Sequence, residues 1–239
     1  MLREIIKFLV EPFRQSIFEK FLVKTQVQLK LLQDKFGDDQ VTRLLPWFSS
    51  GFNSPAPNLV KWHVMQKWGG RSTWIETGTY LGETTSHLSS ISKFVISIEP
   101  ADQLFNNAQV KFASNESVRV VHGTSEGSLQ NILVDLESSK QEDLTFWVDG
   151  HYSAGMTYLG ELECPVLSEL ETIRAIVDFT KPLTILIDDV RSFSRTGEIN
   201  VGYPSLSFLV EWADSTDLYW VIEHDIFIMT NRYQPNSQQ

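Results

Sequence analysis

Short apolar runs alternate with longer amphipathic segments from residue 72 onward. The apolar runs predict strands at Ser72–Thr77, Phe94–Glu99, Val118–His122, Leu144–Asp149 and Leu183–Asp188. The segments between and after them have apolar residues at helical spacing and predict helices at about Thr84–Ile91, Ala101–Ala113, Gly127–Leu136, Pro165–Phe179 and Ser205–Ser215. Strands that alternate with helices in this way are typical of an α/β fold with a parallel sheet.

The end of the chain breaks this alternation. Two β-rich runs, Tyr219–Glu223 and Ile226–Thr230, are separated only by His224 and Asp225. Such a gap permits a hairpin but no crossover helix, so the last strand should run antiparallel to the others. We therefore predict a Rossmann-like α/β fold: a mostly parallel seven-stranded sheet with an antiparallel last strand and helices on both faces.

The first 36 residues predict a helical extension, broken near Pro12. This segment carries seven Lys and Arg against four Asp and Glu. We expect it to pack on the domain or on a second subunit of a homodimer, with a membrane-surface helix as the alternative. The expected domains are an N-terminal extension and loop at 1–58 (with the loop at 46–58), a main domain at 59–233 and a disordered tail at 234–239.

Composition and charge narrow the class of partner. The formal net charge of −10 over 239 residues argues against a protein that coats nucleic acid, because phosphate binding needs a basic face. The single cysteine, Cys164, excludes an intrachain disulfide and suggests a reducing compartment. No apolar run has the length of a transmembrane helix. We expect a cytoplasmic protein that acts on a small molecule, with no nucleic-acid partner and no integral membrane segment.

A glycine-containing turn follows the first predicted strand, Glu76-Thr77-Gly78-Thr79-Tyr80-Leu81-Gly82. Glycine there lets the backbone approach a ligand, and the next helix begins with free N–H groups. A dinucleotide fingerprint would need glycine where Tyr80 stands, so NAD and FAD are disfavoured. The chain has no Gly-Lys-Ser/Thr sequence, which excludes a P-loop.

A nucleoside ligand without phosphates fits this turn better, and S-adenosylmethionine (SAM) is such a ligand. Its methionine carboxylate could lie near Thr79, Tyr80 and Thr84. Glu99 ends the second strand, 21 residues after Gly78, and suits an acceptor for ribose hydroxyls. Ser125 follows the third strand and could bond the adenine. The alternatives are that the glycines only make a tight turn and that Ser125 is an ordinary turn residue.

The fourth and fifth strands both stop at carboxylates, Asp149 and the pair Asp188 and Asp189. Ligands of open parallel sheets bind at the carboxyl ends of the strands, and these two strands should be neighbours. Three carboxylates together suit a hard cation such as Mg²⁺, which could lower the pKa of a substrate hydroxyl. His151 could act as a general base. Alternatively, the aspartates cap turns and His151 bonds backbone.

At roughly residues 70–232 the chain resembles metal-dependent, SAM-dependent O-methyltransferases of the catechol and macrocin types, within the class I methyltransferase superfamily. The resemblance is carried by Glu76-Thr77-Gly78-Thr79-Tyr80-Leu81-Gly82-Glu83-Thr84, Ile98-Glu99, Phe146-Trp147-Val148-Asp149-Gly150-His151 and Ile187-Asp188-Asp189, in this order. It implies that Glu76, Gly78, Tyr80, Glu99 and Ser125 surround SAM and that Asp149, Asp188 and Asp189 hold Mg²⁺. Together with the residues of the turn, the candidate SAM ligands are Glu76, Gly78, Thr79, Tyr80, Gly82, Thr84, Glu99, Ser125 and Asp149.

The sequence departs from the catechol enzymes after the fourth strand. Those enzymes have a lysine base shortly after an Asp-His pair, whereas here Gly150 separates Asp149 from His151, and Tyr152 follows. The catalytic base therefore stays open between His151 and Asp149, the latter being what the macrocin-type enzymes suggest.

The predicted function is SAM-dependent O-methylation of a small hydroxylated, sugar-like acceptor with Mg²⁺ assistance. Two alternatives are a metal-dependent phosphoester hydrolase and a non-catalytic protein that binds SAM or has a structural role. In the loop Arg191–Pro204, which could form an acceptor wall, Arg191 and Arg195 should pair with surface acids. The other interpretation is that they hold a carboxylate or phosphate of the acceptor.

Overall fold

A computed structural model of the chain describes residues 43–44, 46–47, 55–138, 143–150, 164–193 and 203–232. The chain divides into two compact units, Met1–Asn53 and Ser54–Gln239. The expected N-terminal helices at 1–36 and the tail at 234–239 lie outside the described residues. No helix in the described part is long and apolar enough to cross a membrane.

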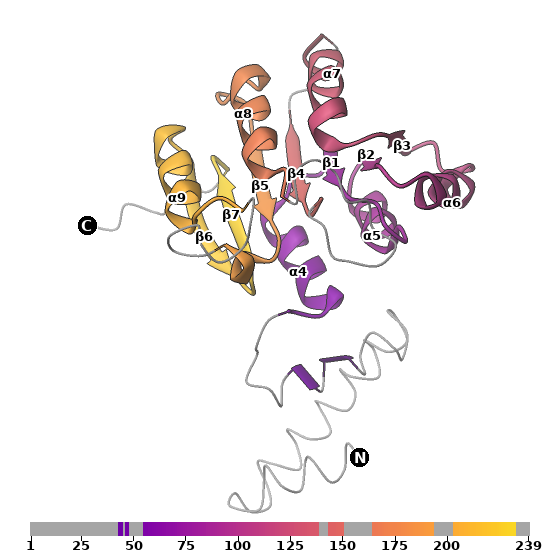
Figure 1. Ribbon diagram of the computed structural model, residues 1–239, viewed down its shortest axis with the longest axis horizontal. Coiled ribbons are helices and arrows are strands. Elements are labelled where there is room, and N and C mark those ends of the chain that lie inside the picture. The colour runs from indigo at the N-terminus through magenta and orange to yellow at the C-terminus, as the bar shows by residue number, and fades with distance from the viewer. Residues whose placement is uncertain are drawn as a thin grey trace, which may run out of the picture. The chain divides into compact units, whose positions relative to one another are not determined.

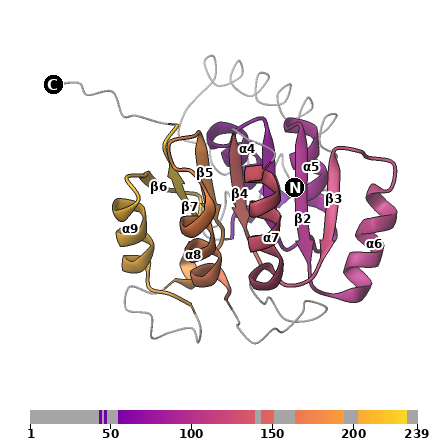
Figure 2. The same cartoon turned by 90° about the horizontal axis from the view of Figure 1, so that it is seen from above.

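The second unit contains the seven-stranded sheet that the sequence predicts (Figure 1). The strands are β1 (Thr73–Thr77), β2 (Phe94–Glu99), β3 (Val118–His122), β4 (Leu144–Val148), β5 (Leu183–Ile187), β6 (Tyr219–Glu223) and β7 (Ile226–Thr230). Their order across the sheet is β3-β2-β1-β4-β5-β7-β6 (Figure 2). Strands β1 to β5 pair in parallel, and β7 pairs antiparallel with both β5 and β6. The predicted fold class and hairpin are confirmed.

Burial along the strands follows their place in the sheet. Every residue of β1, β4, β5 and β7 is buried, as expected of strands covered on both faces. The two edge strands, β3 and β6, consist of half-buried and exposed residues. The apolar runs of the sequence therefore mark the centre of the sheet.

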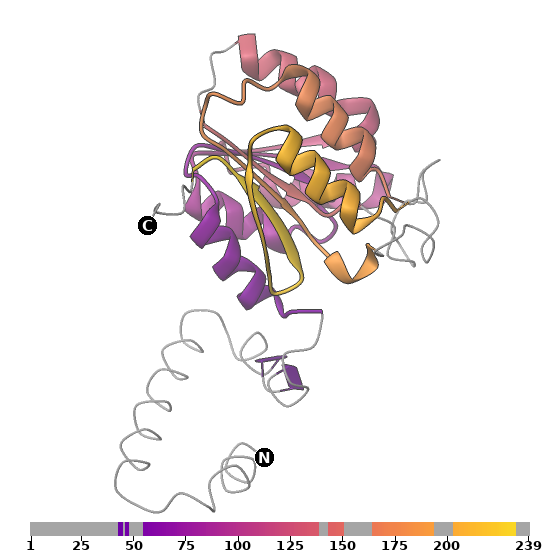
Figure 3. The ribbon, with the colours of Figure 1, turned by 90° about the vertical axis from the view of Figure 1, so that its left-hand side faces the viewer.

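Helices cover both faces of the sheet (Figure 3). The helices are α4 (Asn58–Trp68), α5 (Glu83–Ile91), α6 (Asp102–Phe112), α7 (Ser125–Ser138), α8 (Val166–Ile176) and α9 (Leu206–Ser215). One core cluster joins α7, α8 and α9 to one face, and a second joins α4 and α5 to the other. Each cluster contains alternate residues of the central strands, such as Ile75 in the first and Trp74 in the second.

Two short elements differ from the predictions. The loop expected at 46–58 is wrong at both ends, because Pro46 and Trp47 are helical and α4 begins at Asn58. Pro57 is the N-cap of α4, a position that needs no helical N–H, so this proline marks the start of a helix. A short 3₁₀ helix, η1 (Val190–Ser192), also follows β5 after Asp188 and Asp189.

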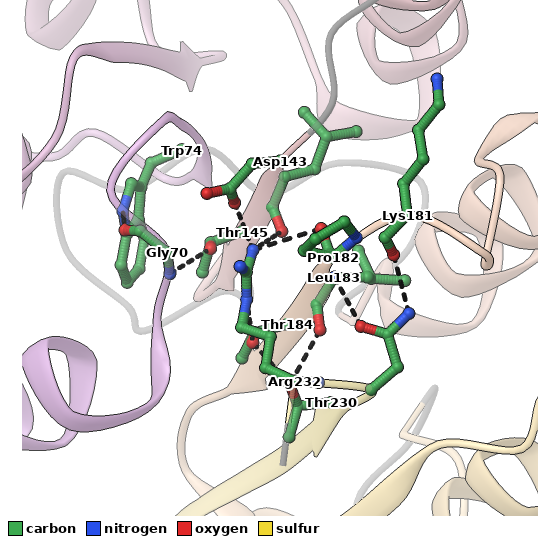
Figure 4. Close-up of polar contacts among 12 residues, drawn as sticks. Gly70, Trp74, Asp143, Thr145, Lys181, Pro182, Leu183, Thr184, Thr230 and Arg232 are labelled. Atoms are coloured by element: carbon green, nitrogen blue, oxygen red, sulfur yellow. Dashed lines mark hydrogen bonds and ion pairs between the residues drawn. The ribbon is translucent and has the colours of Figure 1, made fainter. Parts of the chain in front are cut away.

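A polar cluster ties the end of β7 to the amino ends of β4 and β5 (Figure 4). The Arg232 guanidinium donates to the Asp143 carboxylate, to the carbonyls of Leu144 (3.1 Å) and Pro182 (3.2 Å), and to Thr184 Oγ1 (3.0 Å). This cluster lies at the edge of the sheet opposite to the aspartates that end β4 and β5. It fixes the antiparallel strand against its parallel neighbours.

Candidate functional site

The carboxyl ends of β1, β4 and β5 lie side by side, because β1 and β5 both pair in parallel with β4. The parallel pairing continues one residue beyond the strands: the Asp149 amide donates to the Thr77 carbonyl (3.3 Å), and the Asp188 amide donates to the Val148 carbonyl (3.0 Å). Gly78, Asp149 and Asp188 therefore start three neighbouring loops at one edge of the sheet, where the sequence analysis expected them.

The turn after β1 depends on backbone conformations that favour glycine. Gly78 has φ 92° and Gly82 has φ 69°, and Tyr80 between them also has positive φ, 49°. A Cβ atom at Gly78 would lie 2.8 Å from the carbonyl oxygen of Asp149. The first glycine thus brings the turn into close contact with the end of β4, and no other residue type fits there without a shift.

Glu99 is held against this turn by two backbone amides. The Tyr80 amide donates to Glu99 Oε2 (2.8 Å), and the Ala101 amide donates to Oε1 (3.0 Å). The residue is only 3% exposed. Burial raises the pKa of Glu99 above its ordinary value, and the two amide hydrogen bonds oppose that shift. The carboxylate that ends β2 is therefore fixed in position beside the glycine turn.

Glu76 lies deeper, under the turn, in a buried polar chain. Its Oε2 accepts hydrogen bonds from Thr85 Oγ1 (2.5 Å) and Ser97 Oγ (2.6 Å), and Ser97 Oγ is also 2.5 Å from Thr79 Oγ1. Its Oε1 has no hydrogen-bond partner within the described part of the chain. Burial raises the pKa of Glu76 to about 8, against the effect of the Ser97 and Thr85 hydrogen bonds. At neutral pH this group is mostly protonated, and its bonds join the turn to α5 and β2.

The remaining predicted SAM ligands lie in the turn or at the start of α5 and α7, and their exposed fractions differ. Tyr80 is 49% exposed, whereas Thr79 is buried. Gly82 directly precedes α5, and Thr84 lies in its first turn, half-buried. Ser125 begins α7 and is buried, and the nearby Gly123 amide donates to the Glu99 carbonyl (3.1 Å). The third strand end is thus adjacent to Glu99.

The aspartates that follow β5 are paired with basic side chains. Lys61, on α4, forms an ion pair with Asp188 Oδ2, and its Nζ lies 3.8 Å from Asp189 Oδ1. Arg191 binds Asp189 Oδ1 (2.6 Å) and also forms an ion pair with Asp225 in the β6–β7 hairpin. The expectation that Arg191 pairs with acids of the protein is confirmed, and Arg195 lies outside the described residues.

Lys61 is a half-buried cation in an acidic environment. Its side chain is 16% exposed and that of Asp188 is 1% exposed. Burial would lower the pKa of Lys61, but the charges of Asp188, Asp149 and Asp189 and the hydrogen bond to Asp188 together raise it above its ordinary value. Lys61 therefore carries its positive charge at neutral pH.

The predicted Mg²⁺ ligands do not fit a metal ion in this arrangement. Within the described ranges, no three His, Cys, Asp or Glu residues are grouped so that they could hold one. The Lys61 ammonium forms an ion pair with the Asp188 carboxylate, and the Arg191 guanidinium forms one with the Asp189 carboxylate. The Mg²⁺ site at Asp149, Asp188 and Asp189 is therefore corrected: the acids follow neighbouring strands, but basic side chains of the protein are paired with Asp188 and Asp189.

Lys61 is not among the predicted site residues, because no helix is predicted at residues 59–71. A signal was present: Lys61, Met65 and Trp68 follow the i, i+4, i+7 spacing of one helix face. Met65 is fully buried, so Lys61 lies on the side of α4 that faces the sheet. A lysine on an apolar stripe needs a buried partner, and Asp188 provides it.

Two residues, His151 and Asp149, are predicted as the catalytic base. His151 lies outside the described residues. Asp149 is half-buried at the end of β4, beside Gly78. Both keep the roles that the sequence gives them as predictions.

The sequence matches none of the protein-family models and none of the curated proteins with which it was compared. Among solved structures, it is similar to an O-methyltransferase from Bacillus cereus in complex with SAH (17% identity, 85% of this chain and 96% of that chain, TM-score 0.48). It is also similar to an rRNA methylase from Streptococcus thermophilus (14%, 74% and 96%, TM-score 0.41) and to Aeropyrum pernix fibrillarin with natively bound S-adenosyl-L-methionine (11%, 69% and 67%, TM-score 0.42). The strand order and the antiparallel β7 of the chain itself are those of the class I methyltransferase fold.

Proposed function

We propose that the chain binds SAM at the β1–α5 turn and transfers its methyl group to a hydroxyl oxygen of a small, sugar-like acceptor. The observation that carries the proposal is the pairing of this turn with Glu99. Glycine at position 78 lets the turn lie against the end of β4, where a Cβ would be 2.8 Å from the Asp149 carbonyl oxygen, and the Tyr80 amide holds the Glu99 carboxylate beside the same turn. A glycine turn with an acid at the end of the next strand suits a nucleoside with free ribose hydroxyls.

The shape of the turn also favours SAM over a dinucleotide. A pyrophosphate needs glycine at the position of Tyr80, so that the backbone can approach it. Tyr80 instead places a half-exposed aromatic side chain there. SAM has no phosphate, and its carboxylate can accept from backbone N–H groups at the start of α5.

Residues at three strand ends would have different roles in SAM binding and in methyl transfer. Glu99 would accept from the ribose hydroxyls, and Ser125 would contact the adenine. When bound, SAM supplies a methyl group on a sulfonium, which is electrophilic. Asp149 or His151 would take the proton of the acceptor hydroxyl, and Asp149 starts the loop next to Gly78. Bringing acceptor and methyl together in line is the main catalytic contribution expected of such a site.

The acceptor class rests on the resemblance to O-methyltransferases. The acidic balance of the chain, −10, supports a small neutral or cationic acceptor over a nucleic acid. A cytoplasmic location and a homodimer formed through the N-terminal helices belong to the same proposal.

Calorimetric titration with S-adenosylhomocysteine (SAH) tests the binding site directly. We expect the wild type to bind SAH with a dissociation constant on the order of micromolar. Glu99→Ala should lose about tenfold or more in affinity, because a hydrogen bond to a charged group contributes about 1.5–3 kcal/mol. Glu99→Gln, which keeps one acceptor oxygen, should lose less.

Glu116→Gln is the matched control, because Glu116 is exposed and precedes β3, at the opposite edge of the sheet. It should bind SAH like the wild type. The ribose assignment is wrong if Glu99→Ala also binds normally. The whole proposal is wrong if the folded wild type shows no heat of binding with SAH or SAM.

A further inference from the structure

Asp188 and Asp189, which follow β5, carry negative charges, and Lys61 on α4 provides a positive charge beside them. Leu186 belongs to the core cluster on the α4 and α5 face of the sheet. Because side chains alternate along a strand, Asp188, two residues further, points to the same face. Lys61 reaches it from α4, across a helix–sheet contact that buries Val64 and Met65. The pair is thus set by packing: Lys61 is on α4, and Asp188 directly follows β5.

Lys61 and Arg191 both lie close to Asp189, and Lys61 also pairs with Asp188. Lys61 Nζ contacts Asp188 and lies 3.8 Å from Asp189 Oδ1, the oxygen that Arg191 binds at 2.6 Å. A divalent ion bound to both aspartates would need inner-sphere oxygens at about 2.0–2.1 Å for Mg²⁺, and would have to displace the ammonium. Removing Lys61 from Asp188 would leave an almost fully buried charge, which is costly.

We infer that the Lys61 ammonium takes the place of a divalent cation at the end of β5, so that the site works without a metal ion. As far as it concerns catalysis, this inference rests on the proposed function. Lys61 would act through Asp188: it holds the carboxylate in place and neutralises the strand ends next to the glycine turn. It is a positioning residue for the acceptor side of the site.

Mn²⁺ binding, followed by electron paramagnetic resonance, separates this role from an ordinary structural ion pair. The signal of free Mn²⁺ should be unchanged by the wild-type protein. In Lys61→Ala, Asp188 loses its cation while Arg191 still pairs with Asp189, so Mn²⁺ should bind about tenfold or more tightly than to the wild type. Added Mg²⁺ should then raise the melting temperature of Lys61→Ala but leave that of the wild type unchanged. The double variant Lys61→Ala/Asp188→Asn should show neither effect.

Lys67→Ala is the matched control: Lys67 lies on the same helix, is 48% exposed and pairs with Glu223. It should behave like the wild type toward Mn²⁺. Stoichiometric Mn²⁺ binding by the wild type that Asp188→Asn abolishes would overturn the inference. Failure of folded Lys61→Ala to bind Mn²⁺ would also overturn it, because the position would then not be a cation site.

The wild-type measurement needs no variant, so the inference stays testable if Lys61→Ala does not fold. SAH titration in EDTA and in Mg²⁺ gives a separate result. Equal affinities are expected. If SAH does not bind at all while Mn²⁺ behaves as expected, the proposed function fails and the cation assignment remains.

Discussion

At the scale of single residues, the site is built from groups whose charge depends on burial. Glu76 is completely buried and its pKa is raised to about 8, whereas the two backbone amides that donate to Glu99 oppose the rise that burial causes in its pKa. Lys61 keeps its charge because the charges of Asp188, Asp149 and Asp189 raise its pKa against the effect of burial. Two glutamates that look alike in the sequence, Glu76 and Glu99, thus have different hydrogen-bond partners in the fold.

The raised pKa of Glu76 predicts a pH dependence of stability. Between its ordinary value of 4.5 and about 8, the folded protein keeps a proton that the unfolded chain releases. Stability should therefore fall as the pH rises through this window, by at most about 1.4 kcal/mol per pH unit, and level off above it. Glu76→Gln, which cannot ionise, should lack this contribution.

Urea unfolding of the wild type and of Glu76→Gln at several pH values measures the contribution of Glu76 to the free energy of unfolding. The variant should gain stability relative to the wild type as the pH rises from about 5 to about 8. Glu116→Gln, at an exposed position, should keep a constant difference. A constant difference for Glu76→Gln as well would mean that Glu76 is ionised in the folded protein.

At the scale of elements, the antiparallel β7 depends on polar contacts beyond the strand itself. Asn231 Nδ2 donates to the carbonyls of Phe179 (2.8 Å) and Lys181 (2.7 Å), and Asn231 Oδ1 accepts from the Leu183 amide (2.8 Å). Arg232 joins the same end to β4 and β5. These contacts position the last strand in a way that the apolar pattern does not specify.

Arg232→Ala should destabilise the protein by about 2 kcal/mol or more, since it removes several hydrogen bonds from a side chain that is only 21% exposed. Urea unfolding measures the loss. SAH affinity should stay unchanged, because Arg232 lies at the edge of the sheet opposite to the glycine turn. Arg119→Ala, at an exposed position on β3, is the control and should cost little. A loss of SAH binding in folded Arg232→Ala would contradict this separation.

At the scale of the whole molecule, α4 belongs to the unit that contains the sheet. The division falls after Asn53, whereas the sequence suggested a boundary after residue 58. Asn58 begins α4 and its Nδ2 donates to Glu83 Oε2 (3.0 Å) on α5. The helix therefore forms part of the main domain from its first residue.

Truncation tests this boundary. A chain that starts at Ser54 should unfold cooperatively and bind SAH. A chain that starts at Gly69 lacks α4, exposes the partners of Val64 and Met65, and leaves Asp188 without Lys61, so it should not show a cooperative thermal transition. Circular dichroism during heating distinguishes the two. Equal cooperativity of both chains would show that α4 is dispensable for the fold.

The sequence by itself determined the fold class, the strand positions and the glycine turn. Buried strands need apolar runs, and a two-residue gap between Glu223 and Ile226 allows only a hairpin, so local pattern is enough for these features. It also placed Asp149 and Asp188 at neighbouring strand ends. Only the tertiary structure decided what neutralises them, because Lys61 is 127 residues from Asp188 in the chain and meets it only through helix–sheet packing. Charge pairing across such a distance depends on geometry that no local pattern records.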